Sequence, residues 1–182
     1  MNIARSIFFI FSLLFVACEE IQPELDNPYD PENPSYVSPQ FWFNNNFENG
    51  DTLNSFDANV QWSGNEFSTE FRYKYNEDPW SDWGTVLSLE LSFLDEGDYQ
   101  VLGQARSLSS EETPVDTLKF VIDAVQGPAL MFFPRRHIAS QGDTVTFQII
   151  AEEVENLSGA EINLNISSIE SQLEVVSITQ GT

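Results

Sequence analysis

Residues 66–75 read EFSTEFRYKY, and alternate positions in this segment carry two different kinds of side chain. One set is mainly aromatic and comprises Phe67, Thr69, Phe71, Tyr73 and Tyr75. The other set is polar or charged and comprises Glu66, Ser68, Glu70, Arg72 and Lys74. Successive side chains of a β-strand point to opposite faces of the sheet, so the pattern predicts a strand with one buried and one solvated face.

The same period of two recurs toward both ends of the chain. The apolar positions are Phe56, Ala58, Val60 and Trp62; Leu87, Leu89, Leu91 and Phe93; Tyr99, Val101, Gly103 and Ala105; and Leu118, Phe120 and Ile122. Segments rich in Gly, Asn, Asp, Ser and Pro, which favour turns, separate these runs. We therefore expect residues 40–124 to form an antiparallel β-sandwich of immunoglobulin or fibronectin type III character, with no helix after the N-terminal leader.

Four aromatic and turn motifs in this region resemble those of a known family. They are Phe71-Arg72-Tyr73-Lys74-Tyr75, Trp80-Ser81-Asp82-Trp83, Glu96-Gly97-Asp98-Tyr99 and Phe120-Val121-Ile122-Asp123. Together they are similar to the triple-tyrosine domains, bacterial immunoglobulin-like modules that close the propeller sensors of two-component systems. The resemblance implies that the tyrosines and tryptophans pack the core, and it implies nothing about a ligand.

A second β unit is expected over residues 129–182, beginning with a strand near Met131. Apolar residues alternate again from Val145 to Ala151. The runs 141–147, 154–164 and 173–178 resemble the opening half of a cohesin domain, a jelly-roll sandwich related to carbohydrate-binding proteins. This resemblance implies a strand over 173–178 and a dockerin-like protein or a polysaccharide as partner. Because the family needs a longer chain, we expect this domain to be incomplete at Thr182.

The N-terminus has the order of features of a secretory signal. Arg5 precedes the apolar run Ile7–Val16, which is too short for a confident membrane span and ends at the small residue Ala17. Leu14-Phe15-Val16-Ala17-Cys18 resembles a lipobox. The resemblance to bacterial lipoproteins implies that residues 1–17 are a signal peptide and that Cys18 is acylated and anchors the protein to a membrane. The alternative is an ordinary cleaved leader followed by an accidental cysteine.

Residues 18–39 are expected to form an acidic, proline-rich tether. Prolines cannot donate to a β-ladder, and the acidic side chains repel one another, so we expect an extended segment. The tract 26–34, Asp-Asn-Pro-Tyr-Asp-Pro-Glu-Asn-Pro, resembles the region after the cysteine in lipoproteins of the Bacteroidetes. In those proteins acidic residues such as Glu19 and Glu20 accompany export to the outer surface of the outer membrane. The resemblance therefore implies a surface-exposed, lipid-anchored protein.

The charge balance excludes some classes of function. The chain of 182 residues has 7 basic and 29 acidic side chains, for a formal net charge of −22. Such a surface repels phosphate backbones, so we exclude nucleic-acid binding. The single cysteine cannot form an internal disulfide.

No sequence motif indicates catalysis or a cofactor. The only histidine, His137, lies beside two arginines near a linker, and no nucleophile motif, phosphate loop or zinc spacing is present. We therefore expect a protein that is not an enzyme and needs neither cofactor nor metal. Calcium stays an open alternative because acidic oxygens are abundant, although none lies in a loop of calcium-binding spacing. The relevant residues are Asp51, Asp57, Asp95 and Asp98.

Trp80 and Trp83 are candidate glycan-stacking residues because they flank a short polar loop. The alternative is that both indoles cover the end of the sandwich core. The first functional hypothesis is a membrane-anchored, non-catalytic binding or scaffold protein for protein or polysaccharide partners. The alternatives are the non-catalytic N-terminal part of a longer surface enzyme or sensor, and a carbohydrate-binding protein.

Overall fold

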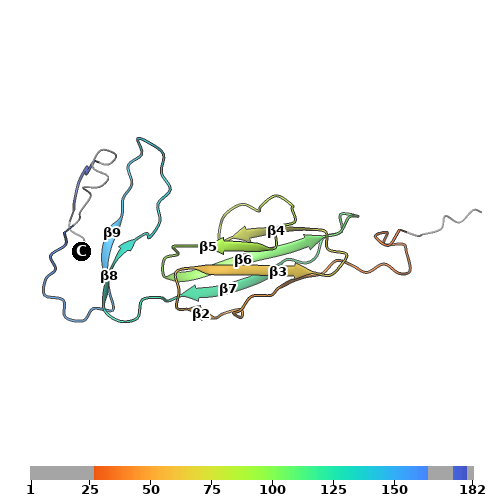
Figure 1. The fold of residues 1–182 in the computed structure, drawn as a ribbon, viewed down its shortest axis with the longest axis horizontal. Helices are drawn as coiled ribbons and strands as arrows, with labels where there is room; N and C mark the ends of the chain where they lie inside the picture. The colour runs from red at the N-terminus through yellow and green to blue at the C-terminus, as the bar shows by residue number, and fades with distance from the viewer. Residues whose placement is uncertain (1–26, 164–173, 180–182) are drawn as a thin grey trace, which may run out of the picture. The chain divides into compact units, whose positions relative to one another are not determined.

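The computed structural model describes residues 27–163 and 174–179 (Figure 1). This part of the chain contains nine β-strands and no helix, which confirms the all-β prediction. The strands are β1 Phe41–Phe43, β2 Thr52–Leu53, β3 Ala58–Gly64, β4 Glu70–Tyr75, β5 Ser88–Leu91, β6 Gly97–Arg106, β7 Asp116–Ile122, β8 Ala129–Phe133 and β9 Gln148–Glu152. The predicted signal peptide and Cys18 lie outside the described residues.

No helix in the described ranges has the length and apolar character needed to cross a membrane. The chain divides into two compact units, with the first ending at Ala124 and the second beginning at Val125.

The first unit is built from two sheets that share one core. One sheet has the strand order β1-β3-β5 and the other has the order β2-β7-β6-β4. In β3, Ala58, Val60 and Trp62 are buried while Asn59 and Gln61 are exposed, as period two requires. The buried apolar residues come from both sheets and the loop before β6, an arrangement consistent with a β-sandwich. They are Ala58, Val60, Trp62, Phe71, Leu94, Val101, Ala105, Leu118, Phe120 and Ile122.

An aromatic stack runs through this core. The Tyr75 and Tyr99 rings stack with centroids 6.0 Å apart, and Tyr99 stacks in turn on Phe120 at 5.6 Å. Burial, together with the neighbouring Tyr99, raises the pKa of Tyr75 to about 12. Burial likewise raises the pKa of Tyr99. Both phenols therefore stay neutral at physiological pH, and the stack contains no charge.

The alternation fails at both ends of the run from Leu87 to Phe93. Leu87 is 47% exposed and precedes β5. Phe93 was expected to face the core, but it is 64% exposed and Leu94 is buried instead. The φ angle of Phe93 is +58°, and the Leu94 amide donates to the Phe56 carbonyl at 2.9 Å. The backbone therefore leaves the extended conformation after β5, and the strand periodicity does not carry past Leu91.

Two short strands were not predicted individually, and one of them changes the expected topology. β1 has three residues and β2 has two, which is too short for an alternating pattern to be recognised. β2 pairs with β7 in parallel, with Thr52 opposite Val121 and Leu53 opposite Ile122. The expectation of a wholly antiparallel sandwich is therefore wrong at this edge.

Residues 27–36 are turned, where an extended tether was expected. Asn27, Asp30 and Asn33 each precede a proline, and each side chain accepts a hydrogen bond from the backbone amide two residues later, at 2.8–3.0 Å. The carbonyl of each of these residues also accepts a bond from the amide three residues later. Proline fixes φ for a turn and the Asx side chain closes it, so this local chemistry outweighs charge repulsion.

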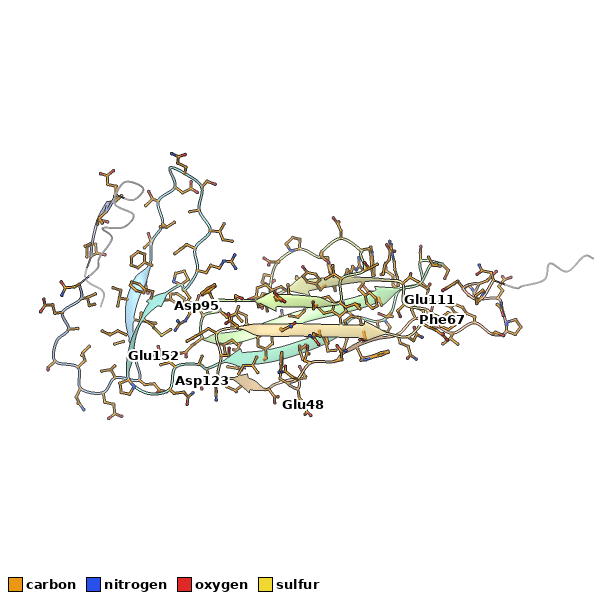
Figure 2. The ribbon with its side chains drawn as sticks, viewed as in Figure 1. Glu48, Phe67, Asp95, Glu111, Asp123 and Glu152 are labelled. Carbon is orange, nitrogen blue, oxygen red and sulfur yellow. The ribbon has the colours of Figure 1, made fainter. Side chains whose placement is uncertain are left out.

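These turns are fixed to one end of the sandwich. The Tyr29 ring packs edge-on against Phe67 with centroids 5.8 Å apart, and the Tyr36 hydroxyl donates to the Glu111 carboxylate. Figure 2 shows Phe67 and Glu111 at the same end of the first unit. The Asn65 side-chain amide also donates to the Ser38 carbonyl at 2.9 Å. Residues 27–38 therefore extend the sandwich and do not act as a free linker.

The second unit contains one antiparallel hairpin in the residues that the structure describes. β8 pairs with β9 over five residue pairs, from Ala129 opposite Glu152 to Phe133 opposite Gln148. The strand expected from Val145 begins only at Gln148, since Phe147 lies outside the ladder and its ring packs against Phe132 at 5.3 Å. Residues 174–179 form no strand, so the strand predicted over 173–178 is wrong for its described part. An apolar segment forms a β-strand only when a neighbouring strand pairs with it through hydrogen bonds.

Candidate functional site

The outward face of the β2-β7-β6-β4 sheet gathers charged and aromatic side chains. Strand alternation explains the charges, because every second residue of β4, β6 and β7 packs against the core. These inward residues include Phe71, Tyr73, Val101, Ala105, Leu118 and Phe120. The alternate, outward positions hold four of the seven basic residues of the chain. They are Arg72, Lys74, Arg106 and Lys119. A predominantly acidic protein therefore presents a mixed-charge face here.

The segment after β4 brings two indole rings over this face. Backbone hydrogen bonds join Phe71 and Gly84 in both directions, at 2.7 and 2.9 Å. The Ser81 amide donates to the Tyr73 carbonyl at 2.8 Å, and its hydroxyl accepts from the Tyr73 amide at 3.1 Å. These bonds hold Trp80 and Trp83 beside the edge of β4.

The two indoles stack with two guanidinium groups. The Arg72 Cζ atom lies 5.0 Å from the Trp80 ring centroid and 4.3 Å from that of Trp83. The Arg106 Cζ atom lies 4.6 Å from the Trp83 centroid. We call these four residues the Trp–Arg ladder. A cation over an aromatic face is attracted by the ring quadrupole, so each indole already has a charged partner.

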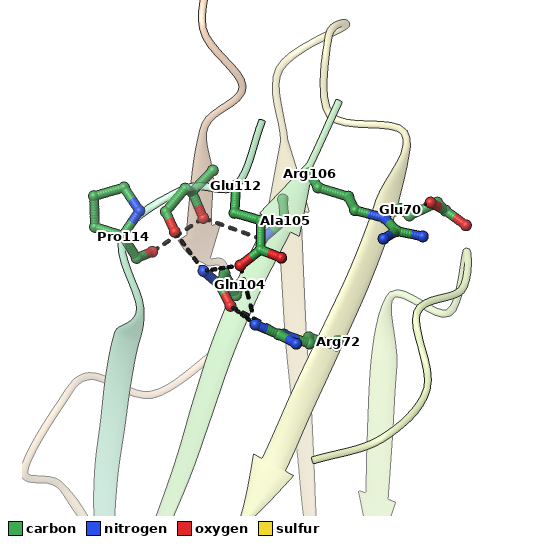
Figure 3. Close-up of polar contacts among 8 residues, drawn as sticks. Glu70, Arg72, Gln104, Ala105, Arg106, Glu112 and Pro114 are labelled. Atoms are coloured by element: carbon green, nitrogen blue, oxygen red, sulfur yellow. Dashed lines mark hydrogen bonds and ion pairs between the residues drawn. The ribbon is translucent and has the colours of Figure 1, made fainter. Parts of the chain in front are cut away.

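Polar neighbours compensate the charge of both arginines (Figure 3). Arg72 donates to the Gln104 side-chain oxygen at 2.6 and 3.0 Å and pairs with Glu112 at 3.1 Å. Arg106 pairs with Glu70 at 2.6 Å. The buried Gln104 amide nitrogen donates to the Thr113 carbonyl at 2.7 Å and to Glu112 at 3.1 Å. The network satisfies Gln104 fully, as burial of an amide requires.

The tryptophans of this site were predicted from the sequence as candidate binding residues, but its arginines were not. Trp80 and Trp83 are half-buried on the outside of the sheet, stacked with Arg72 and Arg106. A sugar ring would have to use those parts of the indoles that the guanidinium groups leave uncovered. The alternation in residues 66–75 already predicts that Arg72 faces outward. Arg106 lies beside it because β4 pairs with β6, which places Glu70 opposite Arg106.

The remaining sequence candidates do not form a further site in the described residues. His137 bonds the Thr146 carbonyl through Nε2 at 2.6 Å. The four aspartates considered for calcium do not come together in any group of three acidic, His or Cys residues that could hold a metal within 27–163 and 174–179. Asp51 and Asp57 instead accept bonds from the backbone amides of Glu48 and Phe93, at 2.7 and 3.1 Å.

No protein-family model matches this chain, and no curated protein sequence matches it.

Replacing Trp83 with alanine is expected to lower the free energy of unfolding by about 1–2 kcal/mol, because Trp83 contacts both guanidinium groups. Trp80→Ala is the matched control, since Trp80 contacts only Arg72. We expect it to cost less than Trp83→Ala in a urea denaturation series followed by circular dichroism. Equal losses for the two variants would show that the ladder contributes nothing beyond the area the rings bury.

Proposed function

We propose that this protein is a bacterial cell-surface lipoprotein whose folded part is a non-catalytic binding or scaffold module. The observation that carries the proposal is the order of features at the N-terminus, in which a basic residue and a short apolar run lead to Ala17 and Cys18. A thiol at the end of such a run is available for acylation at the bilayer surface. Acyl chains on Cys18 would hold the protein at the outer membrane, facing outward.

Two features support an immunoglobulin-like assignment for the first unit. The order β1-β3-β5 matches the A-B-E order of one sheet of that fold, and the order β7-β6-β4 matches the G-F-C order of the other. The Tyr99 hydroxyl, near the start of β6, also donates to the Asp95 carbonyl four residues upstream at 2.9 Å. A tyrosine in this position with this bond is a recurrent feature of the E–F corner in immunoglobulin-like domains.

The mechanism of such a module is tethering. Nine residue steps separate Cys18 from Asn27, where the docked turns begin. A chain of that length spans at most about 30 Å when fully extended. The anchor would therefore keep the first unit near the lipid surface and raise the effective concentration of any bound partner there.

The second candidate is the non-catalytic N-terminal part of a longer surface enzyme or sensor. The observation that favours it is the exposure of large apolar side chains around the hairpin of the second unit. They are Leu130, Phe132, Phe133, Val145 and Phe147, each 41–55% exposed. Under the cohesin-like reading of residues 129–182, further β structure or a dockerin-like protein would cover them.

The anchor is tested by replacing Cys18 with alanine in the full-length protein expressed in a Gram-negative host. We expect incorporation of labelled palmitate to fall to background, because the thiol that accepts the acyl chain is gone, and we expect the protein to leave the membrane fraction. Ala17→Gly keeps a small residue before the cysteine and serves as the control that retains both signals. Undiminished labelling and membrane association of the Cys18→Ala protein would refute the lipoprotein proposal.

A further inference from the structure

The outward face of the β1-β3-β5 sheet differs from the rest of the first unit in its chemistry. Strand alternation turns Phe41 and Phe43, Val60 and Trp62, and Leu89 and Leu91 toward the core. The residues between them face outward, together with Asn44, which follows β1. We call this surface the Trp42 face. Its members are Trp42, Asn44, Asn59, Gln61, Ser63, Ser88 and Glu90.

Trp42 differs from the other three tryptophans. Its side chain is 41% exposed, whereas Trp62 is 1% exposed in the core. Trp80 and Trp83 stack with arginines. Within the described part of the chain, the Trp42 ring packs against no other aromatic ring or cation and its indole N–H has no hydrogen-bond acceptor. An exposed indole offers an apolar face together with an N–H donor, and tryptophan is enriched at interfaces for this reason.

The residues beside Trp42 supply unpaired polar groups. The strand register places Trp42 opposite Ser63, Gln61 opposite Ser88, and Asn59 opposite Glu90. Adjacent strands lie about 4.8 Å apart, so these side chains form a continuous array. The side chains of Asn59, Gln61 and Ser88 are exposed and make no hydrogen bond to the described protein. Only Asn44 and Ser63 bond each other, at 2.9 Å.

The charge of this face narrows the class of ligand. The outward residues of β1, β3 and β5 include no basic residue and one acidic residue, Glu90, in a chain with 29 acidic side chains. The opposite sheet face carries four basic residues. A surface of amides, hydroxyls, one indole and a single carboxylate favours neither an anionic nor a cationic partner. A protein partner would favour an apolar centre of several residues, and Trp42 is the one large apolar side chain that β1, β3 and β5 turn outward.

We propose that the Trp42 face binds a neutral polysaccharide. An indole ring stacks on the C–H face of a sugar ring, and amides and hydroxyls exchange hydrogen bonds with sugar hydroxyls in both directions. Trp42 is the stacking platform, and Asn59, Gln61 and Ser88 are the hydrogen-bonding side chains. The inference rests on the proposed role as a binding module and names its partner, but it does not depend on the lipid anchor at Cys18.

The test is native affinity electrophoresis of the full-length protein in detergent. The gels contain soluble β-glucan, xylan, mannan or galactan, with polygalacturonate as a charged comparison. We expect retardation in at least one neutral gel and none in polygalacturonate. Trp42→Ala is expected to weaken binding at least about tenfold, because it removes the central aromatic contact. Gln61→Ala is expected to weaken binding by a smaller factor.

Trp80→Ala is the matched control, since it removes an indole from the other face of the same sandwich. It is expected to bind like the unmodified protein, while circular dichroism verifies that each variant is folded. The inference is overturned by three results: no retardation in any neutral gel, unchanged binding by Trp42→Ala, or loss of binding in Trp80→Ala alone. The Cys18→Ala protein is expected to bind as the unmodified protein does, so failure of the anchor and failure of glycan binding are separate outcomes.

Discussion

Replacing Trp62 with alanine is expected to lower the free energy of unfolding by about 3–5 kcal/mol. Trp62 is 1% exposed and is the largest side chain buried to this extent. Its ring packs against Tyr73 of the facing sheet with centroids 5.4 Å apart. The Nε1 group donates to the Val86 carbonyl at 3.0 Å. Removing the indole would leave a cavity between the two sheets and remove this bond, so both effects act in the same direction.

Trp42→Ala provides a matched control for this measurement. Both changes remove an indole from the β1-β3-β5 sheet, but Trp42 faces outward and is 41% exposed. We expect Trp42→Ala to cost less than about 1 kcal/mol in the same urea denaturation series. Trp62→Phe separates the two contributions, because it keeps an aromatic ring and loses only the N–H donor and part of the volume. A loss for Trp62→Ala no larger than that for Trp42→Ala would show that Trp62 does not fill the core between the two sheets.

The correctly predicted strands are those in which successive side chains alternate between the core and the solvent. In β3 and β7, buried and exposed residues alternate, so the sequence alone indicates which side chains form the core. The failures occur where backbone geometry intervenes. A positive φ at Phe93 ends the alternation, and the Asx-proline turns of 27–36 draw in a segment whose composition favours extension. β1 and β2 exist because neighbouring strands pair with them, and no local pattern reveals that pairing.

The same distinction applies to the binding surfaces. Trp80 and Trp83 stand out in the sequence because they lie close together, but their stacking with Arg72 and Arg106 depends on how β4 pairs with β6. Trp42 lies between two phenylalanines, and only the pairing of β1 with β3 shows which of the three rings faces outward. Residues far apart in the chain thus create the chemistry of each face, and a single sequence does not specify their register.

The four tryptophans have different roles in the core and on the two outward faces of the sandwich. Trp62 stabilises the core, Trp80 and Trp83 stack with compensated arginines, and Trp42 stands among unpaired polar side chains. Both sheets nevertheless share one core, so a change in the packing between them would act on both faces. A site where a ring from one sheet lies against the backbone of the other is therefore an informative place to perturb.

Gly103→Ala is expected to lower the free energy of unfolding by about 1–3 kcal/mol, because it overfills the space between the sheets. A Cβ atom at Gly103 of β6 would lie 2.0 Å from Cζ of Phe41, whose ring comes from β1 of the other sheet. The Phe41 ring itself packs edge-on against Phe43 with centroids 5.1 Å apart and contacts the core, so it cannot move without loosening its neighbours.

A double-mutant cycle tests whether this contact is the cause. Phe41→Leu removes the end of the ring, and in its presence Gly103→Ala is expected to cost less than it does alone, giving a coupling energy of about 1 kcal/mol between the two sites. Gly84→Ala is the matched glycine control, since a Cβ there would meet nothing within 4 Å. It is expected to change stability by less than about 0.5 kcal/mol. If the effects of Gly103→Ala and Phe41→Leu were additive, the contact with the Phe41 ring would not be the cause of the destabilisation by Gly103→Ala.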